Sequence, residues 1–180
     1  MKIPHTLLLS CVLSLEGCST TVDYPQTWPP VAVLVGAGCE SIFGTYSNTG
    51  EEAAAGQPTY LSDWLLDRNS KARAYRYLSI TLNESKSIDL RGTDAAASET
   101  VLLSRIERYD CENGALTIYL SAVKSGDNAV SVGSSKRKLY RSPGHLVVES
   151  LENGVGIVLL IPVVASANNW ARFPISKAEH

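Results

Sequence analysis

From Ile42 onward, apolar and polar residues alternate with a period of two, which is the pattern of half-buried β-strands. The alternation is clearest in residues 77–82, 87–90 and 116–120. Turn-forming residues separate the alternating segments, at Asn83 to Lys86, Asn113-Gly114, Ser142-Pro143-Gly144 and Asn153-Gly154. The two Asn-Gly pairs favour hairpins. We therefore predict a mostly β fold, an antiparallel small barrel or strongly curved sheet.

One segment follows a helical period instead. Three apolar residues, Leu61, Trp64 and Leu65, recur at helical spacing, and the pair Pro58-Thr59 ahead of them is a start signal. We expect one short helix here, closing one end of the sheet.

Residues 155–164 form the most apolar run after residue 18, interrupted by Gly156 and Pro162. The run is too short to cross a bilayer as a helix, which needs about 20 residues. It predicts a central strand that is buried on both faces and ends or bends at Pro162. Small and polar residues predict loops at Glu51 to Gln57, Thr93 to Thr100 and Ser125 to Ser135.

A basic run occupies residues 136–138, with Arg141 close by. In a strand these charges would alternate across both faces, which is typical of an exposed edge strand protected against aggregation. A site for lipid headgroups or cell-wall polymer is the alternative interpretation.

The start of the chain has the composition of a secretory leader. Lys2 and His5 make a short basic start, residues 6–15 are an apolar core, and Gly17 precedes Cys18. This order resembles the signal sequence of bacterial lipoproteins, although Glu16 replaces the small uncharged residue usual there. The resemblance implies cleavage before Cys18 and its acylation by fatty acids such as palmitate. Because stable anchoring needs about two acyl chains, the several chains of this class would hold the protein at the membrane.

Three regions follow from this pattern: a signal peptide at residues 1–17, a lipidated cysteine and tether at 18–30, and a single β-rich domain at 31–180. The tether is polar and contains Pro25, Pro29 and Pro30. Ser19, by the sorting rule of enterobacterial lipoproteins, implies delivery to the outer membrane, with the domain facing the periplasm. Sixteen basic and 18 acidic residues give a net charge of −2, so charge gives no case for a nucleic-acid partner.

The chain has four cysteines. Cys11 would leave with the leader and Cys18 would carry lipid, so Cys39 and Cys111 remain to form one disulfide in an oxidising periplasm. Two separately buried thiols are the alternative. A zinc site is not expected, because His145 and His180 do not lie at a ligand spacing.

Two resemblances involve the rest of the chain. Residues 39–50, with 139–141 and 170–173, resemble a family of small uncharacterised lipoproteins from Gram-negative bacteria, which implies no particular activity. Gly44-x-Tyr46 and the late Arg172 are also similar to a lipocalin motif, in which a Gly-x-Trp strand packs its ring beneath an arginine. That resemblance implies a contact between Tyr46 and Arg172 that closes a barrel, with Gly44 leaving room for close backbone approach.

The sequence contains no Gly-x-Ser-x-Gly elbow, phosphate loop or dinucleotide fingerprint. We therefore expect no enzymatic activity, no cofactor and no metal. The leading hypothesis is a lipid-anchored, non-enzymatic outer-membrane protein of undetermined partner, which contacts the bilayer through Cys18. A lipocalin-like carrier of an apolar ligand is the alternative. A hydrolase that recruits His145 is a more distant one.

Overall fold

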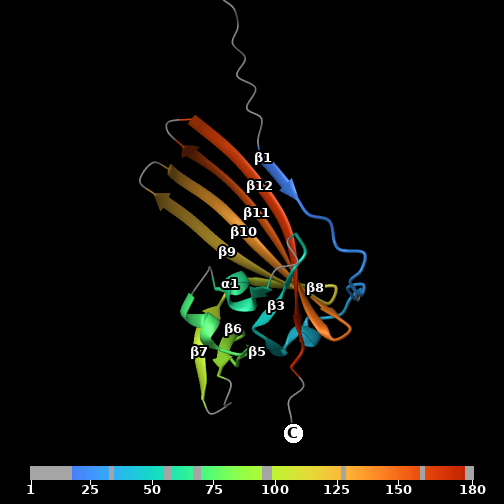
Figure 1. Ribbon diagram of the computed structural model, residues 1–180. Helices are drawn as coiled ribbons and strands as arrows, with labels where there is room; N and C mark the ends of the chain where they lie inside the picture. The colour runs from blue at the N-terminus through green and yellow to red at the C-terminus, as the bar shows by residue number, and fades with distance from the viewer. Residues whose placement is uncertain are drawn as a thin grey trace, which may run out of the picture.

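The computed structural model describes residues 18–32, 35–54, 58–66, 70–94, 99–126, 129–158 and 161–176. The predicted signal peptide, residues 1–17, lies outside the described residues. The described chain is mostly β, with antiparallel sheets and one short α-helix, as predicted (Figure 1). The sheets are strongly curved and pack against each other, but they do not close into a barrel.

The larger sheet has the strand order β4-β3-β12-β11-β10-β9-β8, and β1 pairs with β12 beside β3. All neighbours are antiparallel except β1 and β12, which are parallel. Its strands are β1 (Cys18–Thr21), β3 (Thr49–Glu52), β4 (Pro58–Tyr60), β8 (Tyr109–Glu112), β9 (Ala115–Gly126), β10 (Ala129–Ser142), β11 (His145–Val158) and β12 (Ile161–Pro174).

The smaller sheet has the order β2-β5-β6-β7. Its strands are β2 (Gly44–Ser47), β5 (Tyr77–Leu82), β6 (Ile88–Thr93) and β7 (Thr100–Ile106), and the helical elements are η1 (Glu40–Ile42), α1 (Leu61–Leu65) and η2 (Ser70–Ala74). A bridge between Tyr46 and Ile175 joins β2 to the chain just after β12. The first strand of the smaller sheet therefore meets the end of the chain.

The hydrophobic core lies where the two sheets and α1 meet. Burial of its apolar side chains is the main favourable contribution to folding. Beyond this core, β9 to β12 continue as a curved blade that extends away from α1 and the smaller sheet (Figure 1). The largest fully buried side chains include Tyr46, Phe173, Ile42, Leu61, Leu78, Ile80, Leu116 and Leu139.

Three of the four predicted turns, the short helix and the alternating segments are confirmed. Asn113 and Gly114 have φ angles of 53° and 76° and join β8 to β9, as a type I′ hairpin requires. Gly144 has a φ of 76° in the turn between β10 and β11. The short helix is α1, and the alternating segments are β5, β6 and part of β9.

The predictions for the blade are wrong. Asn153-Gly154 is not a turn but lies inside β11, paired with Ser134 and Gly133 of β10. Residues 155–164 do not form one buried strand; they divide between β11 and β12, and Val155 is 59% exposed. Of the loop expected at 125–135, residues 129–135 belong to β10. Pairing on both sides overrides the local turn preference here.

The basic run is also not on an edge. β10 pairs with β9 and β11 along this segment, and Arg137 is only 8% exposed. The edge-strand prediction is wrong because both edges of β10 are paired here. Arg137 can be buried because it has polar partners inside the protein.

The Cys39–Cys111 disulfide is confirmed, with Cα atoms 5.5 Å apart. It joins the segment before η1 to β8. No helix among the described residues is long and apolar enough to span a membrane.

Candidate functional site

A groove of about 670 Å³ lies between the blade and the rest of the domain. Its floor consists of small residues of β10, β11 and β12, and its wall comes from Leu65 of α1, residues 104–108 and Leu120 of β9. Side chains alternate between the two faces of a sheet. By this alternation, the floor residues lie on the same face as the core residues further along the same strands. Small floor residues leave the space that larger side chains fill in the core. The floor residues include Gly133, Gly154, Gly156, Ala165 and Ala167.

Arg137 and Glu152 lie at the polar end of the groove. Arg137 Nε donates a hydrogen bond of 2.9 Å to the carbonyl of Trp64, and its Nη2 donates one of 2.9 Å to Glu152 Oε1. Its Nη1 donates to Ser135 Oγ. The Arg137 side chain is 9% exposed and that of Glu152 is 47% exposed. The guanidinium is therefore fixed in place, whereas the carboxylate remains open to solvent.

A second hollow of about 470 Å³ also has Arg137 and Glu152 in its lining. It is bounded by β4, α1 and residues 167–169 of β12, and contains the Asp63–Arg73 ion pair of 2.6 Å. The Arg137–Glu152 pair thus borders both hollows. Chemically, the larger groove offers a floor of small residues, with the fixed Arg137 guanidinium and the accessible Glu152 carboxylate at one end. The charged residues Arg105, Glu107 and Arg108 lie in its wall.

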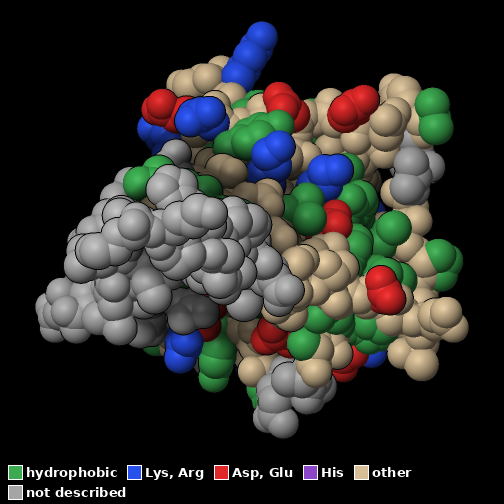
Figure 2. Space-filling view, turned by 90° about the horizontal axis from the view of Figure 1, so that it is seen from above, with side chains coloured by type: hydrophobic (Ala, Val, Ile, Leu, Met, Phe, Trp, Pro, Cys, Tyr) green, Lys and Arg blue, Asp and Glu red, His purple; other side chains and the backbone are tan. Residues whose placement is uncertain are grey.

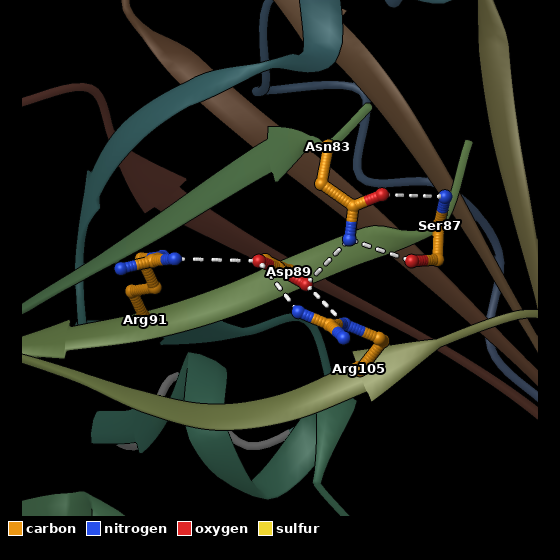
Figure 3. Close-up of polar contacts among 5 residues, drawn as sticks. All are labelled: Asn83, Ser87, Asp89, Arg91 and Arg105. Carbon is orange, nitrogen blue, oxygen red and sulfur yellow. Dashed lines mark hydrogen bonds and ion pairs between the residues drawn. The ribbon is translucent and has the colours of Figure 1, made fainter. Parts of the chain in front are cut away.

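Arg105 lines the same groove and is held by a polar cluster around Asp89 (Figure 3). The buried Asp89 carboxylate accepts hydrogen bonds from Arg105 Nε at 2.9 Å and Asn83 Nδ2 at 3.0 Å. It also forms an ion pair of 3.4 Å with Arg91. The hydrogen bond from Arg105 is the main cause that lowers the pKa of Asp89. Ser87 completes the cluster by donating its N–H to Asn83 Oδ1 at 3.0 Å.

The N-terminal segment, predicted as a tether, lies on the outer face of the larger sheet. Trp28 is 8% exposed, with the guanidinium carbon of Arg172 4.8 Å from its ring centre. Tyr24 packs edge-on against Trp170 at a centroid distance of 5.1 Å. This docking depends on aromatic residues far apart in the sequence, with Tyr24 in contact with both Trp28 and Trp170.

Cys18, the predicted lipidation site, is the first residue of β1 and is paired with Ala165 of β12. Its side chain is not among those that the structure describes. Thr20, two residues further on, lines the groove. The predicted lipid site and the groove therefore lie on the same part of the molecule.

The predicted contact between Tyr46 and Arg172 is wrong. Arg141 lies beside Tyr46 instead, with its Nη1 3.1 Å from the phenol oxygen, while Arg172 forms an ion pair of 2.6 Å with Glu51. The reason is the strand alternation: Phe173 faces the core, so Arg172 faces the other side of the sheet.

The close backbone approach expected at Gly44 occurs at Gly50 instead. A Cβ on Gly44 would lie 3.6 Å from the Tyr46 phenol oxygen, an ordinary contact. A Cβ on Gly50 would lie 2.2 Å from the Arg172 carbonyl oxygen and against the Phe173 ring. Gly50 is thus the residue that permits close approach of β3 to β12.

The residue types considered for catalysis do not converge in the described part of the chain. His145 Nδ1 lies 3.2 Å from the carbonyl of Pro143, in the β10–β11 turn. Among the described residues there is no group of three or more His, Cys, Asp or Glu placed to hold a metal ion.

Sequence reasoning missed Glu152 and Arg105, and it named Arg137 only as part of the basic run at 136–138, not as a residue of this groove. A weak signal for Arg137 existed, since an arginine at an inward position between alternating residues of a strand requires a buried partner. Its partner at Trp64 is 73 residues away and no local pattern predicts it.

Comparison with known proteins gives no relative. No family model matches the chain, no curated protein matches it, and no solved structure matches its fold.

Proposed function

We propose that this chain is a lipid-anchored protein of the bacterial outer membrane that faces the periplasm and binds a partner without catalysing a reaction. The leader pattern that ends at Cys18 supports the anchor. The Cys39–Cys111 disulfide supports export, because disulfides persist in oxidising compartments.

The observation that carries the binding role is the groove. Its volume of about 670 Å³ lies within the range of about 300–1,000 Å³ typical of small-molecule sites. Thr20 belongs to the strand that begins at Cys18, so an anchored protein would hold this groove close to the membrane surface.

A carrier of an apolar ligand is the second candidate, and the groove lining favours it. Leu65, Ile106 and Leu120 face the small residues of the floor, and Arg137 with Glu152 offers polar contacts at one end. An apolar chain with a polar end matches this distribution. The groove is formed by an open curved sheet, so the carrier hypothesis does not require a closed lipocalin barrel.

The anchor is tested by mass spectrometry of the full-length protein extracted from bacterial membranes. We expect the mature chain to begin at an acylated Cys18. Cys18→Ser should abolish acylation and release the protein from the membrane fraction. A mature chain with a free Ser19 amino terminus would contradict the anchor.

The groove is tested with two substitutions at Gly154. A Cβ there has its nearest neighbour at 3.8 Å, so Gly154→Ala fits and serves as the control, whereas Gly154→Leu fills the floor. With the apolar fluorophore N-phenyl-1-naphthylamine, Gly154→Leu should bind at least about tenfold more weakly, equivalent to about 1.4 kcal/mol. Equal binding by both variants would exclude the groove as the apolar site. Absence of binding to every form would remove the carrier candidate.

A further inference from the structure

Three exposed valines form one row across the blade. Val132 of β10 is paired with Val155 of β11, which is paired with Val164 of β12. Directly paired residues in a sheet point to the same face, so the three side chains are neighbours. They are 56%, 59% and 56% exposed, respectively. Isolated exposed valines are ordinary, but a contiguous row is a candidate contact surface.

The row lies at the level of the predicted lipid site. Cys18 is paired with Ala165, the residue that follows Val164. A strand rises about 3.3 Å per residue, so the main chain of Cys18 lies about this distance from the valine row, measured along the strands. On the other side of Cys18 the next row is polar, with Ser19 and Ser166 hydroxyls 3.2 Å apart.

The blade therefore changes from polar to apolar at Cys18. Beyond the valine row, β11 continues to Val158 and β12 begins at Ile161, about 10 Å further on. Residues 155–164 contain no charged residue.

Among the described residues, charged side chains of both signs are visible from this end of the molecule. Seen from above, from the end toward which the blade extends, the described Lys and Arg side chains are interspersed with Asp and Glu (Figure 2). Apolar contact is thus the stronger attraction that the described residues offer to a membrane.

We infer that the valine row inserts into the surface of the lipid bilayer that anchors Cys18. This inference rests on the proposed lipid anchor. Acyl chains on Cys18 would enter the membrane beside the valines, and the serine row would remain at the level of the headgroups.

The open edge of the sheet limits the depth of insertion. β1 covers β12 only from Ala165 to Asn168, and among the described residues no strand pairs with that edge at residues 161–164. Exposed backbone N–H and C=O groups are too costly in hydrocarbon, so the edge stays within the interface. The depth is that of an interfacial element, about 5–10 Å.

Site-specific fluorescence tests the inference. Val155→Cys carries an environment-sensitive fluorophore in the full-length, acylated protein, reconstituted in vesicles of phosphatidylethanolamine and phosphatidylglycerol with brominated acyl chains. The control is the same label at Leu82→Cys, since Leu82 is 47% exposed on β5, away from the blade. We expect the bromolipids to quench the label at Val155 several-fold more than the label at Leu82.

Equal quenching at both positions would overturn the inference. A second copy of the protein that covers the valines would also overturn it. In that case the emission of the Val155 label would be blue-shifted, the bromolipids would not quench it, and the blue shift would depend on protein density in the vesicle.

A second measurement separates this inference from the anchor. Cys18→Ser protein, which cannot be acylated, is added to the same vesicles, and binding is compared with a form that also carries Val132→Asp, Val155→Asp and Val164→Asp. We expect at least tenfold weaker binding by the aspartate form, with an unchanged circular dichroism spectrum. If mass spectrometry finds no acyl group on wild-type Cys18 but the valine-dependent binding persists, only the anchor fails. If Cys18 is acylated and neither measurement depends on the valines, only the insertion fails.

Discussion

Arg137 Nε donates a hydrogen bond of 2.9 Å to the main-chain carbonyl of Trp64, and thereby connects the middle of β10 to α1. The carbonyl lies near the end of the helix, where main-chain acceptors lack partners within the helix. A guanidinium supplies several donors in fixed directions, so one side chain can serve the carbonyl, Ser135 and Glu152 together. This contact fixes α1 as one wall of the groove.

We predict that Arg137→Met destabilises the protein by about 1–3 kcal/mol, because it leaves a buried carbonyl without its donor. Glu152→Gln should cost less than about 1 kcal/mol, since the Glu152 side chain is 47% exposed and its ion pair is screened by solvent. Denaturant unfolding measures both losses. Lys136→Met, at the exposed neighbouring position, is the control. Equal losses for Arg137→Met and Lys136→Met would contradict the structural role of Arg137.

We predict that replacing both Cys39 and Cys111 with alanine destabilises the protein by about 4 kcal/mol. The disulfide spans 72 residues, and the chain-entropy account gives a loss of this size for such a loop. Urea unfolding of the wild type and the double variant gives the difference. Adding a reductant should lower the stability of the wild type alone; an equal effect on both proteins would point to another cause.

The fold was predictable where a local pattern has one consistent interpretation. In β5, Leu78 and Ile80 are fully buried and alternate with more exposed residues, so the period of two identifies the strand. The cysteine pairing was predictable because only two cysteines remain after the predicted processing. In both cases the information lies in the residues themselves.

Local patterns failed where pairing partners decide the structure. Asn153-Gly154 has strong turn chemistry, yet β10 and β12 flank it, and Gly154 is paired with Gly133 and Ala165. A row of small residues across three strands accommodates glycine in a strand interior without loss of packing. The sequence carries this row, but only the register brings its members together.

The candidate site was the least predictable part. Arg137, Glu152 and Arg105 come from three strands of two sheets, and their spacing in the sequence forms no motif. The lipocalin resemblance led to Arg172, whereas the arginine beside Tyr46 is Arg141. The predicted contact is absent because Arg172 faces the opposite side of the sheet from Phe173 and the core.

We predict that Tyr46 couples to Arg141 and not to Arg172. The Tyr46 hydroxyl donates to the carbonyl of Ile42 and accepts from Arg141 Nη1. A double-mutant cycle with Tyr46→Phe and Arg141→Met, read by denaturant unfolding, should give a coupling of about 0.5–1.5 kcal/mol. The matching cycle with Arg172→Met is the control and should be additive. Coupling in the second cycle alone would contradict the arrangement described here.

We predict that Trp28→Ala loosens the N-terminal segment without unfolding the domain. Trp28 is buried against Arg172, and a cation–π contact that is partly desolvated contributes about 0.5–2 kcal/mol. Amide hydrogen exchange should become faster in residues 18–32 while β5 and β6 remain protected. The exposed Thr27→Ala is the control. Faster exchange throughout the domain would mean that Trp28 is part of the general core.

We predict that Asp89 contributes to the way the free energy of unfolding depends on pH in acid. Hydrogen bonds from Arg105 and Asn83 and the nearby Arg91 lower the pKa of Asp89 in the folded protein. A carboxyl group with a depressed pKa stabilises the fold above its unfolded pKa, near 4, and this contribution is lost as the pH falls through the lower folded pKa. Asp89→Asn should therefore lower stability at pH 7 and flatten the decline of stability below about pH 4. Asp63→Asn is the matched control, because Asp63 is paired at the surface with Arg73, which is 47% exposed. Urea unfolding from pH 7 to pH 2 measures both slopes, and an unchanged acid slope in Asp89→Asn would exclude Asp89 as the group that titrates.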